Sequence, residues 1–123
     1  MPSVRTELMI AVDDVEASSL WYQKLLGCKS NHGGSEFDRL VYDESVLLLL
    51  HHRGAPEHPS LSANGPTIDG LVIYFRVEGI ASFYERALTM DARDLTPVKH
   101  NAISHQQEFS LLDPDGYFIT ICE

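Results

Sequence analysis

The stretch Trp21-Tyr22-Gln23-Lys24-Leu25-Leu26 has a counterpart later in the chain, Phe83-Tyr84-Glu85-Arg86-Ala87-Leu88. Each stretch has an aromatic residue followed by Tyr, then two polar residues, and each ends in Leu. A second pair follows in the same order: Asp43-Glu44-Ser45-Val46-Leu47-Leu48 and Asp115-Gly116-Tyr117-Phe118-Ile119-Thr120. Chance explains one such match more easily than two, so the sequence predicts an internal repeat.

The residues around the first stretch predict a strand followed by a helix. Leu8-Met9-Ile10-Ala11-Val12 is a compact apolar run, typical of a strand buried on both faces. Asp14 can cap a helix over residues 15–26, because its carboxylate can accept hydrogen bonds from the free amides of the first turn. Gly27 stands where a left-handed C-terminal cap belongs.

Turn residues divide the rest of each half into short strands. Gly33-Gly34-Ser35 and Asp43-Glu44-Ser45 separate three strand candidates within residues 28–50, the last of them Val46–Leu50. Prolines and glycines between His51 and Gly70 indicate a linker. The second half then repeats the order, with these expected elements: a strand at Leu71–Val77, a helix at Ile80–Leu88, an ill-defined strand within 90–105, and a hairpin closed by Asp113-Pro114-Asp115-Gly116.

These elements predict an α+β fold made of two βαβββ repeats in one domain, residues 1–123. Repeat one covers about 4–53, the linker about 54–69, and repeat two about 70–123. Each repeat is expected to form a curved, mixed four-stranded sheet with a helix on its convex face. The two sheets are expected to pair around a cup that encloses a small ligand.

Charge and composition exclude several classes of function. Nine Lys and Arg against 18 Asp and Glu give a net charge of −9, which argues against nucleic acid and anionic membranes and favours neutral or cationic ligands. The two cysteines have no Cys-x-x-Cys spacing, and the longest apolar run, Val46–Leu50, is too short to cross a membrane. The expectation is a cytoplasmic protein without a membrane partner.

Two groups of motifs flank the repeat and carry a resemblance. The first is Val12-Asp13-Asp14-Val15-Glu16-Ala17-Ser18 with Trp21-Tyr22 and Leu25-Leu26-Gly27, and the second is Phe109 with the turn at residues 113–116 and a final strand. Together they resemble the vicinal-oxygen-chelate superfamily over nearly the whole chain. That superfamily includes glyoxalase I, extradiol dioxygenases, fosfomycin-resistance enzymes and bleomycin-binding proteins.

The resemblance implies where a metal would be held. Members that use one bind it through a side chain from the first and last strand of each repeat. Counting from Val12, from Val77 and from the two turns places these positions at Glu7, Leu48, Val72 and Thr120. Only Glu7 is a plausible ligand, so no metal cofactor is expected. The alternative is one divalent metal ion in an atypical set, such as Glu7 with His52 and a residue from 90–105.

Strand alternation predicts which side chains line the cup. Three polar residues are candidate catalytic groups: Glu7 as a base or a solvated residue, Tyr74 as a donor or a core residue, and His52 as an acid or base. His51 would face the opposite side from His52. Arg76 is expected to hold a ligand carboxylate or to pair with Glu7. The expected ligand-binding residues are Met9, Leu48, Leu50, Val72, Arg76, Phe118 and Thr120, with Ala11 and Cys122 beside them.

Two functions remain open. One is a metal-free binding protein, similar to the bleomycin-binding branch, which sequesters a hydrophobic or cationic small molecule and forms a homodimer by resemblance. The other is a lyase, isomerase or dioxygenase-like enzyme, using an atypical metal site or acid–base chemistry by Glu7 and Tyr74. The fold supports neither over the other, because function depends on the site.

Overall fold

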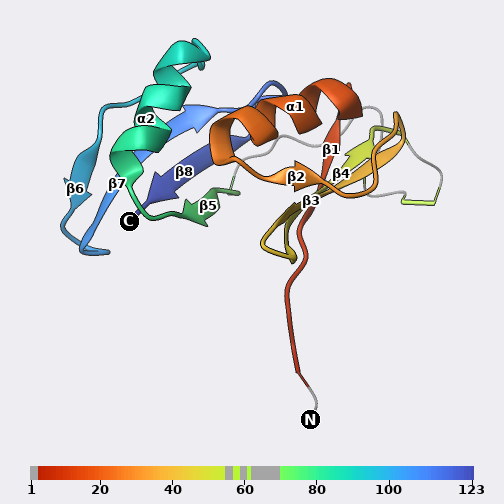
Figure 1. Cartoon of the computed structure of the whole chain (residues 1–123), viewed down its shortest axis with the longest axis horizontal. Coiled ribbons are helices and arrows are strands. Elements are labelled where there is room, and N and C mark those ends of the chain that lie inside the picture. The colour runs from red at the N-terminus through yellow and green to blue at the C-terminus, as the bar shows by residue number, and fades with distance from the viewer. Residues whose placement is uncertain (1–2, 55–56, 59–60, 62–69) are drawn as a thin grey trace. The chain divides into compact units, whose positions relative to one another are not determined.

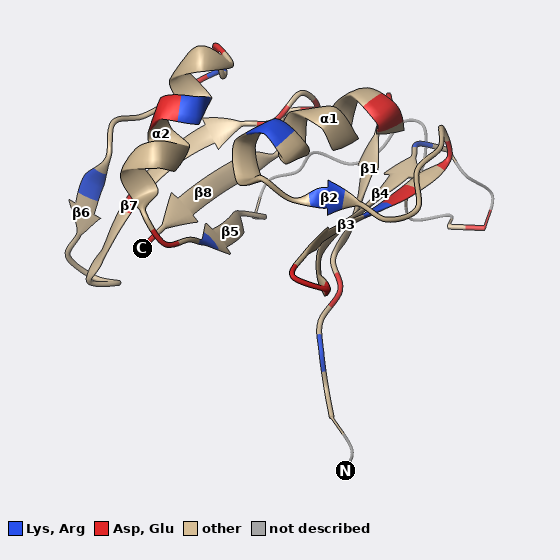
Figure 2. Cartoon of the chain, viewed as in Figure 1, with Lys and Arg blue, Asp and Glu red and all other residues tan. Residues whose placement is uncertain are grey.

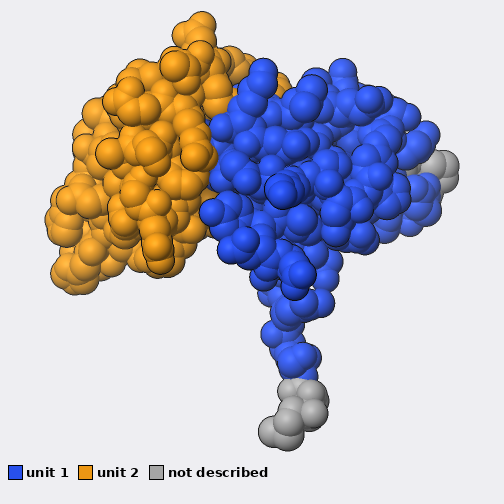
Figure 3. Space-filling model, in the orientation of Figure 1, with its two compact units in different colours: residues 1–66 blue, residues 67–123 orange. Residues whose placement is uncertain are grey.

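The computed structural model describes residues 3–54, 57–58, 61 and 70–123. The chain divides into two compact units, residues 1–66 and 67–123 (Figure 3), and each is described by itself. The predicted linker, about 54–69, lies mostly outside the described residues. No helix in the described ranges is long and apolar enough to cross a membrane.

Unit 1 is a four-stranded mixed sheet with one helix. In chain order its elements are β1 (Met9–Val12), α1 (Val15–Leu26), β2 (Lys29–Ser30), β3 (Phe37–Tyr42) and β4 (Ser45–His52). The strand order is β1-β4-β3-β2, in which β1 runs parallel to β4 and the other pairs are antiparallel (Figure 1). The parallel pair follows from the helical crossover between β1 and the meander.

Unit 2 repeats this topology. Its elements are β5 (Ile73–Arg76), α2 (Ile80–Thr89), β6 (Lys99–Asn101), β7 (Gln106–Leu112) and β8 (Phe118–Cys122). The strand order is β5-β8-β7-β6, again with the first strand parallel to the last. The predicted α+β fold with two βαβββ repeats is therefore confirmed.

Helix α1 has both of the caps that the sequence predicts, whereas the cap at the start of α2 was not predicted. Asp14 accepts a 3.0 Å hydrogen bond from the backbone N–H of Ala17 at the start of α1, and Gly27 ends this helix with a φ of 71°. Gly79, before α2, has no side chain to serve as a cap. Here Glu123 provides one from outside the helix, because its carboxylate accepts hydrogen bonds of 2.9 Å from the backbone N–H groups of Gly79 and Ile80.

Each unit has its own core between the sheet and the helix. Helix α1 packs on β3 and β4, and α2 packs on β7 and β8. Apolar side chains alternate along the strands and are buried on the face beneath the helix. In unit 1 the buried set includes Ile10, Val12, Tyr22, Leu25, Leu40, Leu48 and Leu50, and in unit 2 it includes Ile73, Phe75, Ala87, Phe109, Leu111, Ile119 and Ile121.

Candidate functional site

One face of the unit 1 sheet is covered by α1. The opposite face, on which no helix of the described part of the unit packs, is called the open face here, although some of its side chains, such as Ala11 and His51, are buried. Ser19 of α1 donates a 2.6 Å hydrogen bond to Asp38 of β3, so the face that carries Asp38 is the one beneath the helix. Side chains of paired residues on neighbouring strands share a face. Met9 pairs with Leu49, and Leu49 pairs with Arg39, so these three residues belong to the open face.

The prediction that Leu48 and Leu50 share a face with Met9 is wrong. Leu48 pairs with Leu40, Leu50 pairs with Asp38, and both leucines are fully buried beneath α1. The cause is a β-bulge, which shifts the register of β3 and β4 between Leu40 and Val41 and adds one residue to β4. A residue position counted from the turn at residues 43–45 is therefore one residue too early along β4.

The two adjacent histidines of β4 point to opposite faces, as the sequence predicts. His52 pairs with Val12 on the α1 side of the sheet. It lies at the exposed end of the strand, in a cleft of about 280 Å³ whose lining also includes Asp13, Asp14 and Glu36. His52 therefore lies on the opposite face from Met9, and it does not join the residues expected to line the open face.

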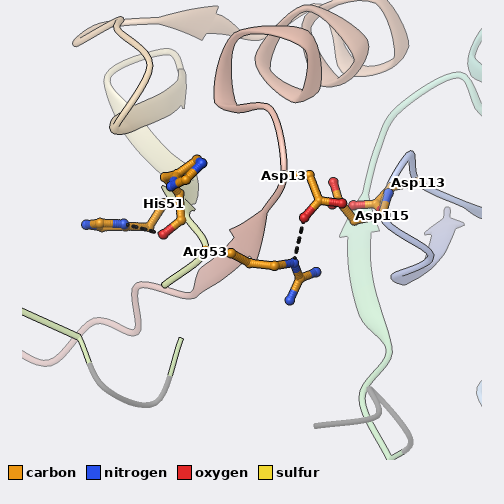
Figure 4. Close-up of polar contacts among 6 residues, drawn as sticks. Asp13, His51, Arg53, Asp113 and Asp115 are labelled. Carbon is orange, nitrogen blue, oxygen red and sulfur yellow. Dashed lines mark hydrogen bonds and ion pairs between the residues drawn. The ribbon is translucent and has the colours of Figure 1, made fainter. Parts of the chain in front are cut away.

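His51 occupies the open face and is only 4 % exposed. Its Nε2 lies 3.0 Å from a carboxylate oxygen of Glu57. Its Nδ1 lies 3.1 Å from the backbone carbonyl oxygen of His52 (Figure 4). Its ring contacts Phe37 and His58 edge-on. Through Glu57 and His58, the His51 side chain contacts the segment that follows β4, which indicates a structural role for this residue. A backbone hydrogen bond is the main reason why the pKa of Glu57 is lowered, and the charge of His51 and its hydrogen bond add to this effect.

Glu7 lies two residues before Met9, just outside β1, and is exposed. Its carboxylate is 4.0 Å from the Nη2 of Arg5, which is also exposed. The residue after Glu7, Leu8, is held to β4 by a 2.9 Å hydrogen bond from the N–H of Leu49 to its carbonyl oxygen. A second surface ion pair joins Arg53 to Asp13 at 3.0 Å (Figure 4).

The open face of unit 2 carries the residues that the sequence predicts for it. Tyr74 pairs with Thr120 and Arg76 with Cys122, on the side opposite to the buried Ile73 and Phe75. Thr120 in turn pairs with Ser110 of β7, and their hydroxyl oxygens are 3.0 Å apart. The same alternation places Val72 and Phe118 on this face, and both are exposed, as is Tyr74.

Three polar residues on the same face were not predicted. The Gln106 amide, with its oxygen turned to Arg76, accepts hydrogen bonds from Nη1 at 3.1 Å and from Nη2. Asn101 of β6 donates a 2.8 Å hydrogen bond to Oε1 of Glu108. The alternation of Gln106, Glu108 and Ser110 with Phe109 and Leu111 is a period-two pattern in the sequence, which could have assigned this face of β7.

The registers also revise one of the four family metal positions. In unit 2, Thr120 pairs with Tyr74, two residues after Val72. In unit 1, the residue two positions after Glu7 is Met9, and Met9 pairs with Leu49. Leu49, and not Leu48, is therefore the counterpart of Thr120. Among the described residues, no three His, Cys, Asp or Glu side chains gather in an arrangement that could hold a metal ion.

Two units with the same βαβββ topology, each with a helix on one face and an open face opposite, define a class of repeat proteins. The chain belongs to the Glyoxalase/Bleomycin resistance protein/Dioxygenase superfamily, whose family model matches residues 6–121. No curated protein matches the sequence.

Solved structures similar to this chain include both a binding protein and an enzyme. A structure from the mobile metagenome of V. pseudocholerae has a TM-score of 0.74 at 21 % identity, covering 99 % of this chain and 95 % of the other. A bleomycin-binding protein complexed with bleomycin has a TM-score of 0.69 at 13 % identity, with 98 % of each chain covered. Lactoylglutathione lyase from Agrobacterium tumefaciens has a TM-score of 0.71 at 14 % identity, covering 99 % and 94 %. At these identities the likeness shows the fold alone.

Proposed function

We propose that this chain is a small-molecule binding protein that holds a hydrophobic or cationic ligand on the open faces of its sheets and has no metal centre. The observation that carries the proposal is the donor set at the four family metal positions: Glu7, Leu49, Val72 and Thr120. Two aliphatic side chains cannot coordinate, and a neutral hydroxyl is a poor ligand for a divalent transition metal. A single exposed carboxylate does not hold such an ion against water.

The open faces have the composition of a small-molecule site. In unit 2, Tyr74, Val72 and Phe118 offer exposed apolar surface on the face that carries Arg76. Thr120 shares this face but is only 2 % exposed. A few polar groups among apolar and aromatic side chains are the usual make-up of a ligand pocket. The net charge of −9 favours a neutral or cationic ligand over an anionic one and disfavours nucleic acid. The likeness to a protein that binds bleomycin supports the same class of function.

The resemblance to the bleomycin-binding branch supports a homodimer. We also propose that the protein is cytoplasmic. Size-exclusion chromatography with light scattering measures the mass directly, because one copy has a mass of 13.8 kDa. A mass of one copy at working concentration contradicts the dimer.

An enzyme of the lyase, isomerase or dioxygenase kind is the second candidate, favoured by the likeness to lactoylglutathione lyase. A metal set containing both Glu7 and His52 is disfavoured, because His52 lies on the α1 side of its sheet while Glu7 precedes the strand residue Met9 of the open face. Acid–base chemistry by Glu7 and Tyr74 remains the form of this candidate to test, by turnover of a dicarbonyl–thiol adduct and its loss in Glu7→Gln.

The first experiment is the metal content of untagged protein by mass spectrometry, before and after chelation. We expect far less than one metal ion per chain, and a melting temperature that chelation does not change. Close to one tightly held Ni, Zn, Fe or Mn ion per chain would overturn the metal-free proposal.

Ligand binding is then measured by a thermal-shift screen of aromatic amines and their neutral analogues, with metal-free bleomycin included. We expect at least one compound to raise the melting temperature of the wild type and to do so less in Tyr74→Ala. A screen in which nothing binds contradicts the proposed function.

A further inference from the structure

Four residues form a row across the open face of unit 2, one from each strand. Arg76 on β5 pairs with Cys122 on β8, Cys122 pairs with Glu108 on β7, and Glu108 pairs with Lys99 on β6. The two basic residues therefore belong to the edge strands β5 and β6 (Figure 2). Glu108 belongs to an inner strand, between them.

The guanidinium of Arg76 already has an acceptor. With the Gln106 amide oriented so that its oxygen faces Arg76, Nη1 and Nη2 donate to that oxygen. Gln106 lies two residues before Glu108 on the same strand. In the described part of the chain, no ion pair joins Glu108 to Arg76 or to Lys99. Neither of the two basic residues of this row therefore neutralises the Glu108 carboxylate through an ion pair.

One oxygen of the Glu108 carboxylate has a partner and the other has none. Oε1 accepts the 2.8 Å hydrogen bond from Asn101, which fixes the orientation of the carboxylate. Oε2 is shielded from solvent and has no hydrogen-bond partner. An unpaired buried polar atom costs free energy, and it is rare in folded proteins unless a ligand or water pairs with it. What this face lacks is therefore a donor.

We infer that the open face of unit 2 contains a subsite for a protonated amine or amidine, whose N–H groups donate to Oε2 of Glu108. This inference rests on the proposed function and names the ligand class for the same surface. Charge-assisted hydrogen bonds of this kind are roughly twice as strong as neutral ones. An anionic ligand is disfavoured, because it would approach the Glu108 carboxylate while Arg76 is engaged by Gln106.

The apolar part of the ligand has a place one row away. Tyr74 is 53 % exposed and Phe118 is 44 % exposed on the same face. Tyr74 lies two strands from Glu108 and two residues along the strand direction. Strand spacing and rise place their Cα atoms about 12 Å apart, and both side chains extend from the sheet. The ligand class is therefore an aromatic group joined by a short linker to an amine or amidine.

The test compares tryptamine with 3-propylindole, a neutral molecule of similar shape, by NMR titration of the full chain. We expect wild type to bind tryptamine about tenfold more tightly, since a hydrogen bond to a charged group contributes this much. In Glu108→Gln the preference should disappear, because an amide keeps the size but loses the charge. Glu85→Gln, an exposed carboxylate on α2, is the control of equal charge and should keep the preference.

Each outcome distinguishes the inference from the proposed function. If both indoles bind wild type equally, or if Glu108→Gln keeps the preference, the cation subsite is wrong while the binding function stands. If neither indole binds, the subsite for an aromatic amine is overturned, whereas the binding function is overturned only if nothing in the thermal-shift screen binds either. Should Glu108→Gln fail to fold, the amide signals of wild type decide: tryptamine must shift those of residues 99–101 and 106–110, and shifts elsewhere alone contradict the subsite.

Discussion

Ser19 on helix α1 donates a 2.6 Å hydrogen bond to Oδ2 of Asp38 on strand β3, and this buried pair joins the helix to its sheet. The other carboxylate oxygen, Oδ1, accepts from the hydroxyl of Ser30 and from the backbone N–H groups of Gly33 and Arg39. Asp38 is only 2 % exposed, yet its four hydrogen bonds favour the ionised form of the carboxylate. A single carboxylate thus orients α1, β2 and the turn that leads into β3.

We expect Asp38→Ala to lower the free energy of unfolding by about 2–4 kcal/mol, because it leaves several donors without an acceptor. Asp38→Asn should cost less, since an amide oxygen can still accept the bonds made to Oδ1. Urea unfolding measures both, with the exposed neighbour Glu36→Gln as control. Equal stability of all four proteins would show that the network contributes nothing.

The same carboxylate makes stability depend on pH. Burial opposes the ionisation of Asp38, but its four hydrogen bonds outweigh burial and hold its pKa below the usual value of 3.8. A carboxyl with a lowered folded pKa stabilises the protein above its unfolded pKa, and this contribution is lost as the pH falls through the folded pKa. Between neutral pH and about pH 3, wild type should therefore lose more stability than Asp38→Asn does. Parallel curves would contradict this.

Glu123 gives a second carboxylate prediction, at the start of α2. Its hydrogen bonds to the N–H groups of Gly79 and Ile80 lower its pKa, because they favour the ionised form at a helix N-terminus. Glu123→Gln should lower the melting temperature at neutral pH, by less than Asp38→Ala. In acid, once wild type is protonated as well, the two proteins should converge. Glu78→Gln removes a nearby exposed charge without these bonds and serves as the control.

The two thiols are expected to be unreactive in the folded protein. Burial raises the pKa of the Cys28 thiol to about 11, and the negative charge of Asp38 adds to the rise. At pH 8 only about one Cys28 in a thousand is then a thiolate, the form that reacts. Cys122 is also buried. A chromogenic disulfide reagent should react slowly with native Cys122→Ser and at once in concentrated guanidinium chloride. Rapid reaction of the native variant would contradict the burial of Cys28.

Local sequence signals were sufficient for most of the fold. Helix α1 spans the predicted residues 15–26, because both of its caps are encoded next to it by Asp14 and Gly27. The matched pairs of stretches correctly predicted two units of one topology. Strand β6 could not be placed within 90–105, because its three residues, Lys99–Asn101, are all polar and have no apolar alternation.

The strand faces of the candidate residues were predicted correctly in unit 2 and only in part in unit 1. Strands β5 and β8 have no bulge, so alternation assigned Tyr74, Arg76 and Thr120 to one face correctly. On β4 the extra residue of the bulge lies within a run of four leucines, where each residue is as apolar as the next. No sequence pattern marks which leucine is unpaired. Glu108 was missed because its lack of a partner is a property of three-dimensional packing.

The register of β4 can be tested with two neighbouring leucines. Leu48 is fully buried beneath α1, whereas Leu49 is partly exposed on the open face. Leu48→Ala should therefore lower the free energy of unfolding by about 2–5 kcal/mol, through lost apolar burial and the cavity left behind. Leu49→Ala removes the same atoms from a half-exposed position, so its cost should be at most about half of that. If Leu49→Ala proves the more damaging of the two in urea unfolding, β4 has the register without the bulge, and Leu48 returns to the face of Met9.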